Sequence, residues 1–137
     1  MPRLVDVASE EQMIDVGQSF SYSLKAGDTV LLSGELGVGK TTFVRGILKG
    51  LGYSGVVVSP TFSLIETYQF KAFNIQHFDL YRLEDEQELE LIGFRDYFTK
   101  DNIIIIEWPQ RIMKMQIPAD YDVRITQLGE VRQLVIQ

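Results

Sequence analysis

Apolar and β-branched runs along the chain predict three strands. Residues 29–32 (Thr-Val-Leu-Leu) follow a Gly-Asp pair and have the profile of a buried strand. Residues 102–107 contain four consecutive isoleucines, which predict a strand buried on both faces, as in the centre of a parallel sheet. Residues 56–58 are valines followed by Ser59-Pro60, a pattern that predicts a strand leading into a constrained loop.

Near the start of the chain, helical spacing of apolar residues predicts an amphipathic helix. It begins with a capping box in which Ser9 is the N-cap residue and Gln12 its partner. We expect the helix to end near Ser23 and to cover one face of a sheet with its apolar stripe, which consists of Met13, Ile14, Val16, Phe20 and Leu24. Residues 4–7, which precede it, are compatible with a short edge strand.

Alternating polar and apolar residues predict two antiparallel hairpins. Residues 64–70 and 73–78 are rich in aromatic and β-branched side chains and are joined by Lys-Ala. Residues 122–126 and 131–136 flank a turn that contains Gly129. The second pair ends the chain, so its C-terminal part is β in character.

Between the first hairpin and the isoleucine strand lies an acidic segment. Residues 84–90 are expected to open a helix, since acidic side chains in a first turn suit the helix dipole. A solvated helix face is the expected role, and a partner-binding surface is the second interpretation. Gly93 is expected to end the helix, with Phe94, Tyr97 and Phe98 packing onto the core.

The composition narrows the class of protein. A length of 137 residues suits one domain, and 13 basic against 19 acidic residues give a net charge of −6, which argues against a broad nucleic-acid footprint. The absence of cysteine excludes disulfides and thiolate metal sites. No secretory signal is visible, and the longest uncharged stretch is broken by glycines and Pro60, so we expect a cytoplasmic protein with no membrane span.

One stretch has the form of a phosphate-binding loop: Gly, four residues, Gly, Lys, and then Ser or Thr. In this chain it reads Gly34-Glu35-Leu36-Gly37-Val38-Gly39-Lys40-Thr41. Backbone N–H groups of such a loop converge on an anion, and the following helix adds the positive end of its dipole. Lys40 would then reach the β- and γ-phosphates, and the Thr41 hydroxyl would bind Mg²⁺.

The context of this motif favours its chemical interpretation. The strand at 29–32 precedes it, and residues 42–51 follow with helical spacing and can end at Gly50 or Gly52. Strand, glycine-rich loop and helix are the order that the motif requires. The fold class predicted is therefore α/β: a P-loop NTPase-like mixed sheet flanked by helices, with antiparallel hairpins that include the C-terminal one. We expect residues 1–137 to form a single domain.

Three further polar residues lie at predicted strand ends or in a loop. Glu107 ends the isoleucine strand as the acid of a Walker B element does, and it could hold the metal's shell, polarise the attacking water, or both. Asp79 follows the first hairpin, where metal or water binding and capping of the next turn are both open. Thr61 belongs either to a switch that senses Mg²⁺ and the γ-phosphate or to an ordinary turn.

Two ring-bearing residues lie beside these acids. His77 is the only histidine of the chain, and a lone histidine on a strand is expected to be structural rather than catalytic. Trp108 follows Glu107 and is expected to pack, in a position from which it could also report nucleotide binding.

Taken together, the chain resembles the TsaE family, also called YjeE-type, whose members are small bacterial ATPases required for N6-threonylcarbamoyladenosine in certain tRNAs. The match rests on residues 32–43 around the loop, 59–62 (Ser-Pro-Thr-Phe), 77–83 (His-Phe-Asp-Leu-Tyr-Arg-Leu) and 106–109 (Ile-Glu-Trp-Pro). The combination, in this order and in so short a chain, is far more specific than the phosphate loop alone.

The resemblance implies a function and a set of residues. It implies a single P-loop ATPase domain with ATP or ADP and Mg²⁺ as ligands, and catalytic roles for Lys40, Thr61, Asp79 and Glu107. The loop would bind the nucleotide through Glu35, Leu36, Gly37, Val38, Gly39, Lys40, Thr41 and Thr42, with Thr41 and Glu107 also at the metal.

The resemblance also implies partners. Members of the family do not make the modified base themselves. They act with the threonylcarbamoyl transferase subunit TsaD and its paralogue TsaB, which modify adenosine 37 of tRNAs that read ANN codons, and they reset that complex between turnovers. Contact with tRNA would be indirect, through the complex.

Three alternatives stay open from the residues. A small-molecule kinase needs an acceptor pocket and a basic lid, to which Arg82, Arg95 and Arg111 could contribute, although no arginine-rich insertion is recognisable. A GTPase is disfavoured because the guanine-reading Asn-Lys-x-Asp is absent. A nucleotide-sensing interaction module, in which hydrolysis serves as a timer, overlaps with the ATPase interpretation.

Overall fold

The computed structural model describes residues 2–60 and 63–137. Seven strands form one mixed sheet in the order β1-β7-β6-β2-β5-β4-β3. In chain order these strands are β1 (Arg3–Val7), β2 (Thr29–Ser33), β3 (Ile65–Gln69), β4 (Asn74–Asp79), β5 (Asn102–Glu107), β6 (Tyr121–Leu128) and β7 (Val131–Ile136). The helical elements are α1 (Glu10–Ser21), α2 (Lys40–Gly50), α3 (Gln87–Leu91) and the 3₁₀ helices η1 (Phe94–Tyr97) and η2 (Pro109–Met115). The predicted α/β class with two hairpins is confirmed.

The centre of the sheet is parallel and its margins are antiparallel. Strands β6, β2, β5 and β4 run in the same direction, whereas β7, β1 and β3 pair antiparallel with their neighbours. The register places Glu107 opposite both Leu32 and Asp79. The carboxyl ends of β2, β4 and β5 therefore lie at one edge of the sheet, where open α/β sheets bind their ligands.

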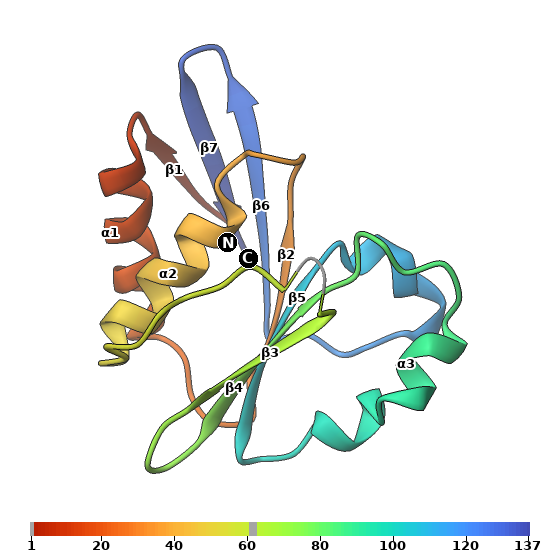
Figure 1. Cartoon of the computed structure of the whole chain (residues 1–137). Coiled ribbons are helices and arrows are strands. Elements are labelled where there is room, and N and C mark those ends of the chain that lie inside the picture. Colours follow the sequence, from red (N-terminus) through yellow and green to blue (C-terminus); the bar gives the residue numbers. More distant parts are fainter. Residues whose placement is uncertain (1, 61–62) are drawn as a thin grey trace.

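Helices cover the two faces of the sheet unequally (Figure 1). Helices α1 and α2 lie on one side, and α3 with the 3₁₀ segments lies on the other. The isoleucines of β5 alternate between the two cores: Ile103 and Ile105 pack toward α1 and α2, and Ile104 and Ile106 pack toward the opposite layer. This burial on both faces is what the isoleucine run predicted.

The two long helices cross at a pair of glycines. A Cβ placed on Gly17 would lie 2.3 Å from the backbone oxygen of Phe43, and one on Gly46 would lie 2.3 Å from that of Ile14. Only residues without a side chain allow this approach, which brings α1 against the first turns of α2. The helix that follows the phosphate loop is thereby held from both sides, by the sheet and by α1.

Both predicted helix starts and ends are close to those observed. The Ser9 hydroxyl accepts from the Gln12 N–H at 3.1 Å, whereas the Gln12 side chain accepts from the N–H of Ala8 rather than from that of Ser9. Helix α1 ends at Ser21, and the last residue of α2 is Gly50, with Gly52 at positive φ just after the C-cap residue Leu51. None of the helices in the described part of the chain is long and apolar enough to cross a membrane.

The strand predicted over residues 56–58 is wrong. No strand forms there, and Val56 is 79% exposed. Both backbone polar groups of Val58 are bonded to one side chain: its N–H donates to the Tyr68 hydroxyl at 3.1 Å, and that hydroxyl donates to its oxygen at 3.0 Å. Burial raises the pKa of Tyr68. Because β3 of the hairpin occupies the sheet edge, this segment lies outside the sheet: Val57 packs against the core, Val56 and Val58 are exposed, and the phenol of Tyr68 holds Val58.

The acidic segment contributes less helix than predicted. Helix α3 spans only Gln87–Leu91, so most of the acidic cluster lies before it, and Leu91 is 88% exposed. Gly93 ends the helix, and Phe94 packs edge-on against Phe78 with a centroid distance of 4.9 Å. The aromatic residues expected in this core are therefore confirmed in place.

Candidate active site

The loop between β2 and α2 forms the rim of the site. Its backbone has positive φ at Gly37 and Gly39, and Gly39 is the residue that precedes α2. A Cβ on Gly39 would lie 3.0 Å from the methyl carbon of Met13 and 3.1 Å from Nη1 of Arg132. The positive φ therefore favours glycine at this position, and a side chain there would also have to displace the ends of Met13 and Arg132. The guanidinium of Arg132 lies directly beside the loop.

The first turn of α2 is available to an anion. No acidic side chain lies in that turn, and no side-chain cap occupies its N–H groups. The first N–H groups of a helix have no partner within the helix and carry the positive end of its dipole. The loop and helix together therefore present backbone donors to the phosphate groups that the sequence motif predicts.

Lys40 is buried at the start of this helix, with a side chain only 6% exposed. Its ammonium donates to the oxygen of Gly34 and lies over the Trp108 ring, 4.2 Å from the centroid. Burial lowers the pKa of Lys40 below 10.5, and the negative charges of Glu107, Asp79 and Glu35 oppose that shift. Among the described residues, the amine therefore contacts the oxygen of Gly34 and the ring of Trp108, and it lies close enough to the carboxylates to feel their charge.

Two carboxylates face each other across the β4–β5 ladder. Asp79 is 5% exposed, and its Oδ1 accepts from the Tyr81 N–H at 3.0 Å. Glu107 is 3% exposed, and its Oε2 lies 2.6 Å from Nε2 of His77. The predicted position of both acids at strand ends is confirmed by the register that pairs them.

These groups line one hollow of about 330 Å³. Its walls consist of Leu36, Gly37, Gly39, Lys40, Thr41, Thr42, Ser59, Asp79, Glu107, Trp108 and Arg132. The predicted site residues Lys40, Thr41, Asp79 and Glu107 are therefore brought together, although they come from separate segments. Thr61 lies outside the described residues.

The other predicted loop residues lie differently. The Val38 side chain is buried in the core beneath the loop, so it can serve a phosphate only through its backbone. Glu35 is exposed, and it lines a neighbouring hollow together with Val38 and Arg124.

The sequence motifs did not identify Arg132. It belongs to β7, whose residues Leu134 and Ile136 are buried in the core that packs against α1 and α2. Because side chains two apart share a face of a strand, the alternation itself places Arg132 on that face, one step beyond the core. The alternation of side chains is visible in the sequence, but it identifies Arg132 as a site residue only once the strand order is known.

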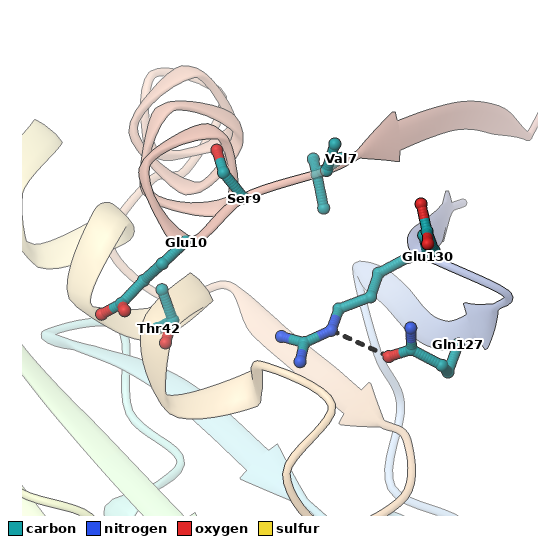
Figure 2. A pocket seen from close by; sticks show the side chains of 8 residues that line it. Val7, Ser9, Glu10, Thr42, Gln127 and Glu130 are labelled. Carbon is teal, nitrogen blue, oxygen red and sulfur yellow. Dashed lines mark hydrogen bonds between the residues drawn. The ribbon is translucent and has the colours of Figure 1, made fainter.

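A second hollow of about 350 Å³ adjoins the first. It lies between the start of α1, the first turn of α2 and the β6–β7 hairpin, and Thr42 and Arg132 line both hollows. Figure 2 shows Glu10 and Thr42 on one side of it and Gln127 and Glu130 on the other. Nε of Arg132 donates to Oε1 of Gln127 at 3.0 Å, and Arg132 lines both hollows.

The donor set fits Mg²⁺ bound together with phosphate. The described residues contain no group of three or more histidine, cysteine or acidic side chains that could hold a metal on its own. Mg²⁺ typically uses one or two carboxylates and completes its shell with water and substrate phosphates. The hydroxyl of Thr41 and the carboxylates of Asp79 and Glu107, which line one hollow, supply oxygen donors of that kind.

Comparison with known proteins agrees with this geometry. The profile of the family described as threonylcarbamoyl adenosine biosynthesis protein TsaE matches residues 7–134. The tRNA threonylcarbamoyladenosine biosynthesis protein TsaE of Haemophilus influenzae is 41% identical, over 93% of this chain and 84% of that protein. The TsaE protein of Borreliella burgdorferi is 39% identical, over 85% of each chain. The crystal structure of Bacillus subtilis YdiB superposes with a TM-score of 0.79 at 25% identity, over 99% of this chain and 84% of that chain.

We expect ATP to change the fluorescence of Trp108, the chain's only tryptophan, because Lys40 has to leave the indole to reach phosphate.

Since burial lowers the pKa of Lys40, its positive charge is lost at a lower pH than in an exposed lysine, and ATP affinity should fall as the pH rises through that range. ATP titrations at a series of pH values, followed by tryptophan emission, measure both effects.

The matched control is Trp108→Phe, which should bind ATP in equilibrium dialysis without a fluorescence signal. Emission that stays constant while dialysis shows ATP bound would contradict the contact between Lys40 and the indole.

Proposed function

The chain belongs to the TsaE family of threonylcarbamoyl adenosine biosynthesis proteins, and we propose that it is a Mg²⁺-dependent ATPase that acts as an accessory subunit in this tRNA modification. The modification is the N6-threonylcarbamoyl group on adenosine 37 of tRNAs that read ANN codons. The observation that carries the ATPase proposal is the convergence of Lys40, Thr41, Asp79 and Glu107 on one hollow beside the glycine loop. In this proposal residues 1–137 act as a single P-loop ATPase domain in the cytoplasm.

The phosphates of ATP would occupy the loop. Backbone N–H groups from Gly37 to Thr42 donate to them, and the ammonium of Lys40 moves from the Gly34 oxygen and the indole to the β- and γ-phosphates. Thr41 and Glu107 would hold Mg²⁺, which when bound neutralises part of the charge on the phosphate oxygens. The carboxylates nearby partly oppose the lowering of the pKa of Lys40 that burial causes.

Hydrolysis would need a positioned water more than any covalent chemistry. Glu107 lines the hollow, so its carboxylate is placed to accept a hydrogen bond from a water that attacks the γ-phosphate. Asp79, held by the Tyr81 N–H, would order the shell of water from the neighbouring strand. Thr61 completes the proposed catalytic set as a switch residue, on the strength of the family pattern. The products are ADP and phosphate.

The nucleoside would extend into the second hollow (Figure 2). Thr42 lies at the boundary of the two hollows, directly after the loop residues that hold the phosphates. The Arg132 guanidinium, fixed by Gln127, is then placed to contact the phosphate nearest the ribose. The polar and acidic side chains beyond it, such as Glu130, supply acceptors for the ribose hydroxyls.

Its action on tRNA would be indirect. The proposed partners are a TsaD-type threonylcarbamoyl transferase subunit and its TsaB-type paralogue, and hydrolysis would reset their complex between turnovers. A net charge of −6 suits a protein partner better than direct capture of tRNA. Isolated turnover should be weak, since an ordered switch or a further cation would come from the complex.

Replacing Lys40 with alanine should lower ATP turnover at least about 100-fold, the typical cost of removing one preorganised charge-stabilising group. Lys49→Ala is the matched control, because Lys49 lies on the same helix but is exposed at its other end and should leave turnover unchanged. Phosphate release with ATP and Mg²⁺ is the measurement. Full turnover in the Lys40→Ala variant would show that ATP is not hydrolysed at this site.

Replacing Arg132 with alanine should raise the KM for ATP about 10-fold or more, the usual cost of losing a hydrogen bond to a charged group. Arg95→Ala is the control, since Arg95 is exposed and pairs with Glu90 on the opposite face of the sheet. Equal KM values for the two variants would place the nucleoside elsewhere.

The partner role is tested with the assembled complex. The full chain, the TsaD-type and TsaB-type subunits and a tRNA substrate are combined with ATP, and modified adenosine is counted against the amount of transferase. We expect several turnovers per transferase with the chain present, and about one without it or with Lys40→Ala. Equal yields in the three reactions would rule out the resetting role and leave the ATPase assay unaffected.

A further inference from the structure

His77 lies directly behind the two acids of the site. In the β4–β5 ladder it pairs with Ile105, two residues before the pair formed by Asp79 and Glu107. Its side chain is completely buried and does not line either hollow at the loop. Nε2 of His77 lies 2.6 Å from Oε2 of Glu107. A completely buried side chain of the sheet therefore contacts an acid that lines the site.

Within the described part of the chain, His77 is the only side chain that hydrogen-bonds the Glu107 carboxylate. Glu107 is 3% exposed, and burying an ionised carboxylate costs free energy unless hydrogen-bond donors satisfy it. The neighbouring acid, Asp79, cannot supply such a donor when it is ionised. The bond occupies Oε2 and leaves Oε1 for the hollow that Glu107 lines. It thus determines which carboxylate oxygen meets a ligand.

The second ring nitrogen identifies the donor. Nδ1 of His77 is buried and finds no partner among the described residues. A proton on Nδ1 would bury an unpaired N–H and would set a lone pair of Nε2 against the carboxylate, whereas a proton on Nε2 makes the short bond and leaves only an acceptor unpaired. The burial of Nδ1 therefore assigns the proton to Nε2.

We propose that His77 is a positioning residue: its Nε2–H fixes Oε2 of Glu107, so that Oε1 points to the water and metal shell at the γ-phosphate. This inference rests on the proposed ATPase function for its consequence, but the hydrogen bond itself is a property of the protein alone. It also gives a role to the single histidine, which is structural in its burial and functional through the acid that it holds.

Turnover of two variants at this position separates positioning from packing. His77→Leu removes the donor and keeps an apolar side chain, and it should lower kcat about 10- to 100-fold, as loss of a partner that orients a metal-site acid typically does. The KM for ATP should stay within about twofold, because His77 does not line the hollow at the phosphate loop. His77→Gln places an amide N–H near the position of Nε2 and should restore most of kcat.

The matched control is Gln76→Leu. Gln76 is the neighbouring residue of β4, is also buried, and hydrogen-bonds Thr67 and Asn102 rather than Glu107. It should lower the melting temperature without a selective loss of kcat. Equal losses in His77→Leu and His77→Gln, or no loss in either, would overturn the positioning role.

A second measurement needs no nucleotide. Because the chain contains one histidine, ¹⁵N-histidine labelling gives one set of imidazole resonances without ambiguity. We expect the proton on Nε2, in slow exchange with water, and fast exchange or a changed tautomer in Glu107→Ala. A proton on Nδ1 in the unmodified protein would overturn the assignment even if every variant folded.

The ATPase proposal and the positioning proposal can fail independently. If the unmodified protein showed no ATP hydrolysis, the proposed function would fail, and the imidazole spectrum would still decide whether His77 holds Glu107. If hydrolysis occurred but the spectrum placed the proton on Nδ1, the ATPase proposal would stand and the positioning proposal would fall.

Discussion

A small group of charges buried at one edge of the sheet governs this structure. Lys40, Asp79 and Glu107 are each less than a tenth exposed, and none could be held there alone because isolated buried charges are strongly disfavoured. The amine and the carboxylates compensate one another, and backbone and imidazole groups satisfy what remains. Loss of any one member would leave an uncompensated charge in the interior, which is strongly destabilising.

The parallel centre of the sheet brings these charges together. Pairing of β2, β5 and β4 fixes Glu107 opposite Leu32 on one side and Asp79 on the other, and the phosphate loop begins where β2 ends. The isoleucines of β5 pack in both layers of the core, and Glu107 at the end of the same strand lines the site. Core packing and the geometry of the site are therefore set by the same strand.

Local patterns predicted much of this from the sequence. The isoleucine run, the capping residue Ser9 and the glycine loop each determine structure within a few residues, and each was found where expected. The three valines at 56–58 were misassigned because the segment stays outside the sheet, where the phenol of Tyr68, a residue of another element, holds the backbone of Val58. Arg132 was missed for a similar reason, since its place beside Gly39 depends on the order of strands, which no local pattern encodes.

The pairing of β1 with β7 has a consequence for how the chain is made. Arg3 lies opposite Ile136, so the first strand finds its partner in the last one, and the two ends of the chain meet in the sheet (Figure 1). The ribosome synthesises β1 before β7. β1 therefore cannot join the sheet until the β6–β7 hairpin has emerged. Contacts so distant in sequence are slow to form, so β1 would lack its sheet partner until β7 has been synthesised.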